Sequence, residues 1–394
     1  MYFVKQTKLL IYNNKLVYIK NGSCIFILTS NTNQMKNLLL LLLFTIPLTY
    51  SCNSKKDSKT QAKETTETKT KSKKKEVTSE TSESFDPIFP SLKNVDSLNS
   101  TIFIPTIENE FSTDKNAIYA ATIGFAWNRI KDTLGINFIE NNDLALINNS
   151  KAFKNSPKKR EYTTELSLTK DPKTGNNLIK SRAYFKKLLP FSRPLQRYNI
   201  GLKFKDKPVP SFGFKGHGPI RILYYNNDND FAIALYPKDK DHEIILYKTD
   251  FKKSISLSKE LKTLNNKVTE FKKDKSNGFI SRRMFNHDDR VKVPIIKFHL
   301  ENDFENIVGS KFTDKESVIW ELLQFYQKNA FILNENGAIV ESEAIEGAVD
   351  AAVEMPAEPK KLFFDKSFIV MLKRKDSDFP YFATFIANDE LLEK

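Results

Sequence analysis

Histidine is the side chain best suited to acid–base or metal chemistry near neutral pH, and the chain contains four. No two of them stand at the short spacing of a helical metal site; they are His217, His242, His287 and His299. His287 is followed by Asp288 and Asp289, in a stretch whose Asn and Asp residues predict a turn. The glycines around His217 lack the strand-to-helix setting of a nucleotide loop, so they also predict a turn.

Other catalytic patterns are missing from the sequence. There is no GxSxG motif and no glycine-rich phosphate loop. The only cysteines are Cys24 and Cys52, which excludes a disulfide scaffold and a four-cysteine zinc site. We therefore expect no enzyme activity, no catalytic residue, no metal and no cofactor. A hydrolase whose catalytic residues are scattered through the sequence stays open as an alternative hypothesis.

Cys52 has a setting that indicates lipid attachment. It directly follows residues 35–51, in which an apolar run over 38–46 is too short to span a bilayer but has the length of a signal-peptide core. The segment resembles a bacterial lipoprotein signal, although Tyr50 is bulkier than the usual residue. This resemblance implies that Cys52 is lipidated and anchors the chain in the bacterial cell envelope, on a face that the sequence does not specify. An ordinary secretory signal with an incidental cysteine is the alternative.

Three further segments follow from composition. Met35 begins the signal, so we expect residues 1–34 to be an upstream extension. Residues 52–85 are dominated by Lys, Glu, Ser and Thr, and such a stretch cannot bury enough apolar surface to offset its ordering entropy. It is expected to be a disordered tether. The remaining residues, 86–394, are expected to form one folded domain.

The charge balance raises nucleic acid or an anionic membrane as partners. The chain has 62 basic and 48 acidic residues and a net charge of +14. The tether is lysine-rich, and elsewhere the basic residues are interspersed with acidic ones, without a basic helix or a regular basic-aromatic motif. We therefore expect no nucleic acid partner. A hydrophobic share of 40% also excludes a fully disordered chain and a polytopic membrane protein.

Hydrophobic periodicity predicts mixed α and β structure in the folded part. Helices are predicted over 114–134, with Trp127 in the core, and over 253–273. Residues 302–309 and 315–323 are interpreted as short helices or turns, and 135–182 show no clear pattern. Strands are predicted over 220–224, 231–236, 243–247, 291–300 (irregular near Pro294), 328–345, 362–373 and 380–387.

Three segments of the last hundred residues, 291–304, 321–338 and 363–389, carry the most specific similarity in the sequence. VKVPIIKFHLENDF (291–304) is similar to a serpin strand followed by a helix, and ELLQFYQKNAFILNENGA (321–338) to the strand that ends in the serpin hinge. FFDKSFIVMLKRKDSDFPYFATFIAND (363–389) is similar to the serpin C-terminus. Weaker similarities lie at AYFKKLLPF (183–191) and DFAIALYP (230–237). The resemblance implies an α+β, multi-sheet fold with a reactive-centre-type loop near the C-terminus.

The sequence also departs from the family pattern. Ser367 replaces a proline, Thr384 stands near a usual glycine, and Asp389 stands where a proline usually follows Asn. The region between the helix predicted at 114–134 and Ala183 is shorter than the family pattern requires. The resemblance therefore implies a reduced N-terminal helical part.

The interval 338–361 suits a reactive-centre loop in length. Its hinge is expected at Glu335, Gly337, Ala338, Val340, Ser342 and Ala344. The alternating face from Ala338 to Ala344 carries small or apolar side chains and could be buried if the loop were inserted as a strand; the other face carries Glu341 and Glu343. Glu346 continues the inward face and breaks this pattern.

Family spacing implies a reactive-site bond between Ala351 and Ala352. A small residue before the cut suits a serine protease with an elastase-like pocket, and the absence of Lys and Arg from 338–359 disfavours trypsin-like enzymes. The leading hypothesis is thus a membrane-tethered suicide inhibitor of such a protease. The alternative is a non-inhibitory serpin-fold lipoprotein that acts as a binding or envelope module, with 338–361 as a solvated linker.

Overall fold

The computed structural model divides the chain into two compact units, Met1–Glu80 and Thr81–Lys394. It describes residues 8–12, 15–20, 23–27, 89–153, 162–185, 188–216, 218–275, 282–338 and 358–394. In the first unit, β1 (Lys8–Tyr12), β2 (Lys15–Lys20) and β3 (Ser23–Ile27) form an antiparallel sheet in sequence order. No element is predicted there from the sequence. The signal over 35–51, the lipidation site Cys52 and the tether over 52–85 lie outside the described residues.

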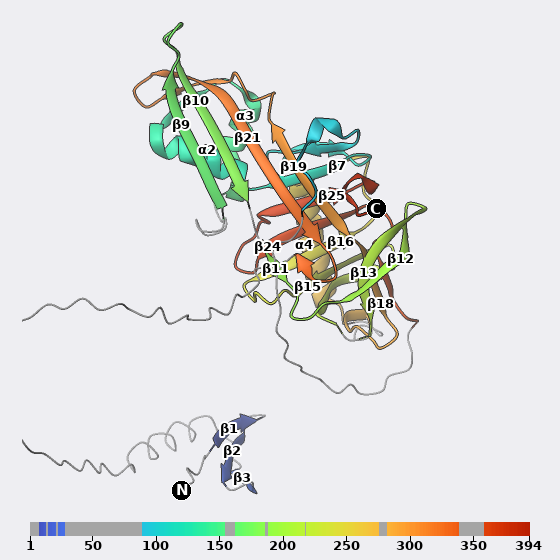
Figure 1. Ribbon diagram of the computed structural model, residues 1–394. Coiled ribbons are helices and arrows are strands. Elements are labelled where there is room, and N and C mark those ends of the chain that lie inside the picture. Colours follow the sequence, from blue (N-terminus) through green and yellow to red (C-terminus); the bar gives the residue numbers. More distant parts are fainter. Residues whose placement is uncertain are drawn as a thin grey trace, which may run out of the picture. The chain divides into compact units, whose positions relative to one another are not determined.

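The longest strands of the second unit form a sheet that we call the seam sheet. Its main path runs β4 (Lys93–Asn94), β19 (Ile296–Asp303), β21 (Ile319–Leu333), β10 (Asn177–Phe185) and β9 (Tyr162–Lys170). Two short strands, β20 (Lys311–Asp314) and β8 (Ile136–Ile139), extend it beside the start of β21. Figure 1 shows β9, β10, β21 and β19 side by side, with α2 against β9 and β10.

A second sheet lies in the centre of the hydrophobic core. Its order is β14 (Ile220–Asn227), β15 (Asp230–Leu235), β16 (His242–Lys248), β24 (Phe368–Arg374), β25 (Phe382–Ile386), β7 (Asn116–Ala120) and β5 (Thr101–Phe103). Every residue of β7, β16 and β25 is buried. These strands are therefore covered on both faces, as expected for strands in the middle of a buried sheet.

Three smaller sheets complete the β structure. The largest of them runs β12 (Gln196–Phe204), β13 (Lys207–Lys215), β18 (Arg290–Pro294) and β23 (Lys361–Phe363). The other two are pairs, β11 (Leu189–Pro190) with β22 (Gly337–Ala338) and β6 (Glu110–Ser112) with β17 (Ser254–Ser256).

The helices have clear local signals. They are α2 (Thr122–Leu134), α3 (Asn142–Asn149) and α4 (Leu257–Lys273). Side-chain oxygens of Asn141 and Ser256 cap the N-termini of α3 and α4, and α2 ends at Gly135, whose φ of +67° suits glycine. Short 3₁₀ turns occur at Val95–Ser97, Lys151–Phe153 and Asp389–Leu391. None of the described helices is long and apolar enough to cross a membrane.

The predicted helix over 114–134 is half wrong. Asn116–Ala120 form β7, and α2 begins only at Thr122. Ile118 and Ala121 fit a helical period, but all five residues of β7 are buried, and a fully buried strand has no alternation to distinguish it from a helix. Trp127 is buried as predicted and packs edge-on against Phe312, with ring centroids 5.3 Å apart.

Other predicted elements also need correction. The helix predicted over 253–273 begins with the short strand β17, and α4 starts at Leu257. The single strand predicted over 291–300 is two strands of different sheets, β18 and β19, separated at Ile295, whose N–H donates to the carbonyl of Pro210. The helix or turn predicted over 315–323 is a turn only before Val318, and the rest is wrong because β21 begins at Ile319.

Most predicted strands are confirmed. The meander β14–β15–β16 follows the predicted alternation and turns, and β25 follows the predicted last strand. The single strand predicted over 362–373 is two strands of different sheets, the end of β23 and β24. The strand predicted over 328–345 is interrupted after Leu333 by a turn that leads into β22, and residues 339–345 lie outside the described residues. The region 135–182, in which no element is predicted, contains β8, α3, β9 and the start of β10. The α+β, multi-sheet class is confirmed.

Candidate functional site

In the middle of the seam sheet, two neighbouring strands pair in parallel, whereas the strands on either side of them are antiparallel to them. β10 pairs with β21 in parallel, from Asn177 opposite Trp320 to Phe185 opposite Asn329. β9 runs antiparallel to β10, and β19 runs antiparallel to β21. A strand placed between β10 and β21 in the opposite direction would therefore pair with both in antiparallel geometry. We call the boundary between these two strands the seam.

The chain turns sharply after β21. Asn334 and Gly337 exchange backbone hydrogen bonds, with N···O distances of 3.0 and 3.2 Å, which closes a tight turn. The carbonyl of Asn336 accepts from the N–H of Phe191 at 3.0 Å, and that of Glu335 accepts from the N–H of Leu195 at 2.8 Å. The turn is thus held against the segment that follows β10.

Gly337 occupies a position where other residues would be strained. Its φ is +104°, which is outside the regions that side chains readily allow. A Cβ at this position would also come within 2.6 Å of the carbonyl oxygen of Leu189 and of the nitrogen of Phe191. These contacts involve backbone atoms, so a side chain could not be accommodated by rotating a neighbour.

Ala338 continues from this turn into β22. It pairs antiparallel with Leu189 of β11, and only 3% of its surface is exposed. β22 therefore runs opposite to β21, beside the strand that continues the direction of β10. Of the residues predicted for the hinge, Glu335, Gly337 and Ala338 lie in this turn and strand. Val340, Ser342, Ala344 and the predicted bond between Ala351 and Ala352 lie outside the described residues.

Arg197 of β12 fixes the turn from the other side. Its guanidinium contacts the Glu335 carboxylate at 3.2 Å and also forms an ion pair with Glu393, near the C-terminus. Partial burial works to lower the pKa of Arg197, but hydrogen bonds and charge attraction from the two glutamates raise this pKa above its usual value. The hinge is thereby connected electrostatically to the last residues of the chain.

Two polar side chains of β21 are buried beneath the seam. The amide of Gln327 donates to the carbonyl of Ala120 at 3.0 Å and to the hydroxyl of Thr122 at 2.8 Å. Asn329 is 1% exposed, yet neither its amide nitrogen nor its oxygen has a hydrogen-bond partner in the described part of the chain. Such a group lowers the stability of the closed sheet, because it has lost its bonds to water without replacement.

The other end of the predicted loop is fixed by a buried ion pair. The ammonium of Lys360 lies 2.9 Å from the Asp289 carboxylate, and the two side chains are 4% and 0% exposed. The same carboxylate accepts the backbone N–H of Lys360 at 2.7 Å and that of Asn286 at 2.8 Å. A buried ion pair needs further hydrogen bonds to offset the free energy lost when its charges leave water. The two backbone N–H groups supply such bonds to the Asp289 carboxylate.

A second buried lysine reinforces this end. The Lys248 ammonium is 2.6 Å from the carboxylate of Asp365 and 2.8 Å from the carbonyl oxygen of Phe363. The backbone N–H of Lys361 donates to Asp228 at 3.1 Å. Residues 360–365 are therefore attached to the core by charged groups from three separate segments.

The histidines are not gathered into a catalytic arrangement in the described residues. His242 is buried between the Tyr381 hydroxyl, at 3.0 Å, and Asp239, at 3.5 Å. His287 lies in a turn as predicted, and the Nδ1 atom of His299 lies 3.0 Å from the carbonyl oxygen of Pro90. Within the same residues, no group of three or more His, Cys, Asp or Glu is placed to hold a metal. His217 lies outside them.

Several residues of this site carry no signal in the sequence. Arg197, Asn329 and Lys360 are separated from one another by long stretches of chain, and only the fold brings them to the hinge, the seam and the loop base. The sequence predicts Asp289 only as part of a turn, and the turn is present. The burial of Asp289 against Lys360 depends on tertiary packing, which the local sequence does not indicate.

No protein-family model matches the sequence. No curated protein matches it either. Solved structures that align with this chain include the thermophilic serpin tengpin, human thyroxine-binding globulin in complex with its hormone, and uncleaved ovalbumin.

The alignments cover most of each chain, but the sequence identity is low. Tengpin is 10% identical over 75% of this chain and 99% of its own, with a TM-score of 0.40. Human thyroxine-binding globulin is 12% identical over 71% and 93%, with a TM-score of 0.37. Ovalbumin is 12% identical over 70% and 94%, with a TM-score of 0.39. Tengpin is described as a serpin, which is the family that residues 291–389 resemble in sequence.

Proposed function

We propose that the chain is a membrane-tethered, serpin-like suicide inhibitor of a serine protease with an elastase-like pocket. The observation that carries the proposal is the parallel β10–β21 pair with β22 beside its end. β22 has the antiparallel direction that a strand needs in order to fill the seam. Its first side chain, that of Ala338, is already buried.

The proposed inhibition is a normal proteolytic step that does not reach completion. The protease serine oxygen attacks the carbonyl carbon of Ala351, the bond to the nitrogen of Ala352 breaks, and that nitrogen leaves as an amine. An ester then links Ala351 to the protease. Cleavage would free the N-terminal side of the loop to enter the seam and carry the attached protease with it, before water hydrolyses the ester.

The alternating pattern of the loop supports insertion over its first part. If the β22 ladder continues with period two, Val340, Ser342 and Ala344 face inward like Ala338. Insertion would also separate β10 from β21 above Asn329, whose unpaired amide could then bond to the new strand. Both features lower the free energy of the inserted form relative to the closed form.

Membrane attachment is part of the proposal and rests on the sequence. A lipid on Cys52 would hold the folded unit in the cell envelope through the segment over 52–85. The lysine-rich composition of this segment would add a weak attraction to anionic headgroups.

A non-inhibitory, binding or structural module is the second candidate, and Glu346 favours it. The same ladder, if continued, brings Glu346 inward between Ser181 and Phe325, which are both buried. A carboxylate at that place would have to be neutralised or paired, since burial of an isolated charge costs several kcal/mol. This residue would oppose insertion beyond Ala344.

The test is incubation of the full chain with an elastase-type protease, followed by a denaturing gel and a melting curve. Inhibition predicts a covalent band at the summed mass of the two proteins. Cleavage near Ala351 with a large rise in melting temperature, but no covalent band, would mean insertion without inhibition. Cleavage with neither result would contradict the inhibitor proposal and leave the binding module.

A matched pair of loop variants separates insertion from recognition. Ala344→Arg places a charge on the inward face, whereas Glu343→Arg places the same side chain on the outward face. Under the proposal, Ala344→Arg is cleaved without forming the covalent complex, and Glu343→Arg still forms it. Equal behaviour of the two variants would contradict strand insertion.

A further inference from the structure

Two of the most exposed apolar side chains of the second unit lie in one row across the seam sheet. Phe138 of β8 is opposite Thr313 of β20, and Thr313 is opposite Ile319 of β21. Residues that are opposite one another in neighbouring strands project from the same face. Phe138 is 62% exposed and Ile319 is 61% exposed. We call Phe138 and Ile319 the apolar row.

β8 is an edge strand, since within the described residues it pairs only with β20. Phe138 is in register with Thr313, and the N–H of Glu140 donates to the carbonyl of Lys311 at 3.3 Å. In an antiparallel ladder, backbone groups point to alternate sides. The N–H and C=O groups of Ile139 therefore point away from β20, toward the open edge, where they can pair with another strand. The register shifts by one residue at Asn137, so this alternation runs only from Phe138 to Glu140.

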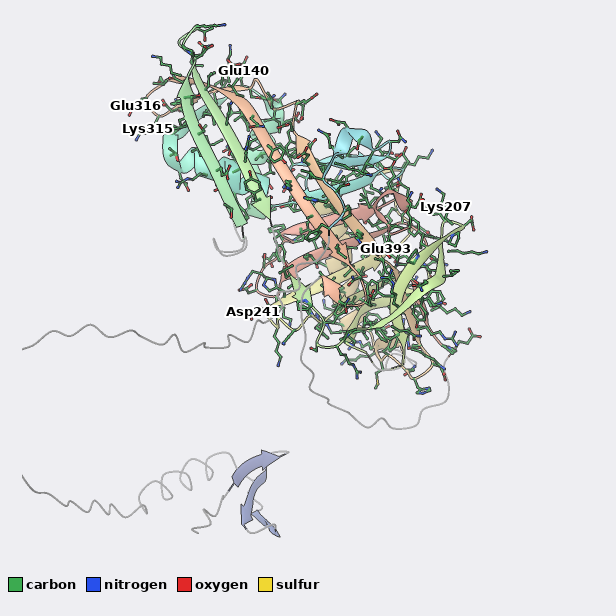
Figure 2. The ribbon with its side chains drawn as sticks, viewed as in Figure 1. Glu140, Lys207, Asp241, Lys315, Glu316 and Glu393 are labelled. Carbon is green, nitrogen blue, oxygen red and sulfur yellow. The ribbon has the colours of Figure 1, made fainter. Side chains whose placement is uncertain are left out.

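Charges of opposite sign lie at the two ends of this edge. Glu140 directly follows the last residue of β8. The Lys315 side chain lies beside Gly135, the residue just before β8, because a Cβ built on Gly135 would be 3.3 Å from the Cδ of Lys315. Figure 2 shows Glu140 and Lys315 at the same end of the second unit. Neither forms a salt bridge within the part of the chain that the structure describes.

We propose that β8 and the apolar row form a homodimer interface, in which β8 of a second copy pairs antiparallel with β8 about a two-fold axis at Phe138. In this register, Ile139 of each copy lies opposite Asn137 of the other, with its outward backbone groups turned toward that residue. The two Phe138 side chains meet as a non-hydrogen-bonded cross-strand pair, the arrangement in which side chains are closest. The proposal does not depend on protease inhibition.

A second copy fits this surface better than an unrelated strand because the surface is self-complementary. Reversing the strand direction places Lys315 of one copy near Glu140 of the other, and the same contact forms twice about the axis. The Phe138 ring also meets its own equivalent rather than a polar surface. The edge is short, so we expect the dimer to be weak and its population to depend on protein concentration.

Sedimentation of the full chain in a non-denaturing detergent, over a series of concentrations, tests the dimer. Phe138→Asp is expected to weaken association by at least about tenfold, since it places two like charges at the centre of the interface. Ile200→Asp is the matched control, because Ile200 is 88% exposed on another edge strand, β12. A chain that stays monomeric at all concentrations, or equal effects of the two substitutions, would overturn the proposal.

Charge exchange and cross-linking test the two-fold register. Glu140→Lys and Lys315→Glu should each weaken association, and the two together should restore it. Phe138→Cys should form an intermolecular disulfide under mild oxidation, because the Cα atoms of such a pair lie roughly 4.5 Å apart. The unchanged chain measures the background disulfide formation through Cys24 and Cys52, and Ile200→Cys measures disulfide formation by an exposed thiol outside the proposed interface. No restoration, or equally fast linking through residue 200, would overturn the register.

Discussion

Arg197 and Glu335 form an ion pair of 3.2 Å that joins β12 to the turn after β21, and the same guanidinium contacts Glu393. The hinge is therefore held by a side chain that lies far from it in sequence. The turn also has backbone hydrogen bonds of its own, so the ion pair adjusts its stability rather than creating it.

Arg197→Met should loosen the hinge without unfolding the protein. Partly exposed ion pairs contribute about 0.2–1 kcal/mol each, so global stability should fall by about 1 kcal/mol or less. The local effect should be larger at the Leu195 amide, which donates to the carbonyl of Glu335. Hydrogen exchange at this amide should accelerate. Lys207→Met, which removes a surface pair with Asp389, is the control and should leave the Leu195 amide unchanged.

Gly337→Ala should destabilise the β21–β22 turn by more than backbone strain alone. Gly337 and Gly175 both have positive φ, but only Gly337 has backbone atoms within 3 Å of the position of a new Cβ. Gly175→Ala should cost about 1 kcal/mol from its φ angle. Gly337→Ala should cost about 2–4 kcal/mol, or release β22 from β11. Equal unfolding free energies for the two variants in urea would show that the close approach is unimportant.

Asn329→Leu should stabilise the protein by about 1–2 kcal/mol. The substitution replaces a buried amide without partners by an apolar side chain of similar volume. Melting temperature should rise by a few degrees. Gln327→Leu is the contrasting variant, because the Gln327 amide donates two hydrogen bonds, and it should cost about 1–3 kcal/mol. A loss of stability in Asn329→Leu would mean that the amide is satisfied in solution.

Asp314 should make stability depend on pH in the acid range. The Trp320 indole N–H donates to its carboxylate at 2.9 Å, and this bond, with those from the N–H groups of Val318 and Glu316, lowers the pKa of Asp314 below its usual value. The stabilisation is complete above the unfolded pKa of about 3.9 and is lost as pH falls through the lower, folded pKa. Urea unfolding between about pH 6 and pH 2 measures this loss. Trp320→Phe removes the main donor, so it should flatten the profile; an unchanged slope would contradict this assignment.

Cys52→Ser should release the protein from membranes if Cys52 is lipidated. The anchor would then be lost, while the folded unit keeps its sequence. Fractionation of cells that express the unchanged chain and the variant measures the result. A variant that still sediments with membranes would contradict lipid attachment at Cys52.

Strands with clear hydrophobic alternation or clear turn residues at their ends could be predicted from the sequence, and strands without these signals could not. β15 and β16 are bounded by Asn- and Asp-rich turns, so their ends were visible. β7 is buried on both faces and resembles a helix in its composition. β9 is largely exposed and polar, so its hydrophobic alternation is too weak to indicate a strand.

The hinge was predictable only in part. Glu335, Gly337 and Ala338 were identified by family resemblance, and the positive φ of Gly337 gives a physical reason for a glycine there. Of the partners of this segment, Leu189 lies in the weakly similar segment 183–191 and Arg197 in a stretch with no motif, and their contacts with the hinge depend on tertiary packing. No pattern within one segment could reveal them.

The order of strands in the core sheet has a consequence for synthesis. β25, the last strand of the chain, lies between β24 and β7, and the amide of Ala387 donates to Asn116, 271 residues earlier. A ribosome adds about 5–20 residues each second, so β7 waits many seconds for its neighbour. Until then its apolar edge is open to chaperones or to aggregation. This sheet can therefore be completed only after β25 has been made, although β7 and β5 can pair much earlier.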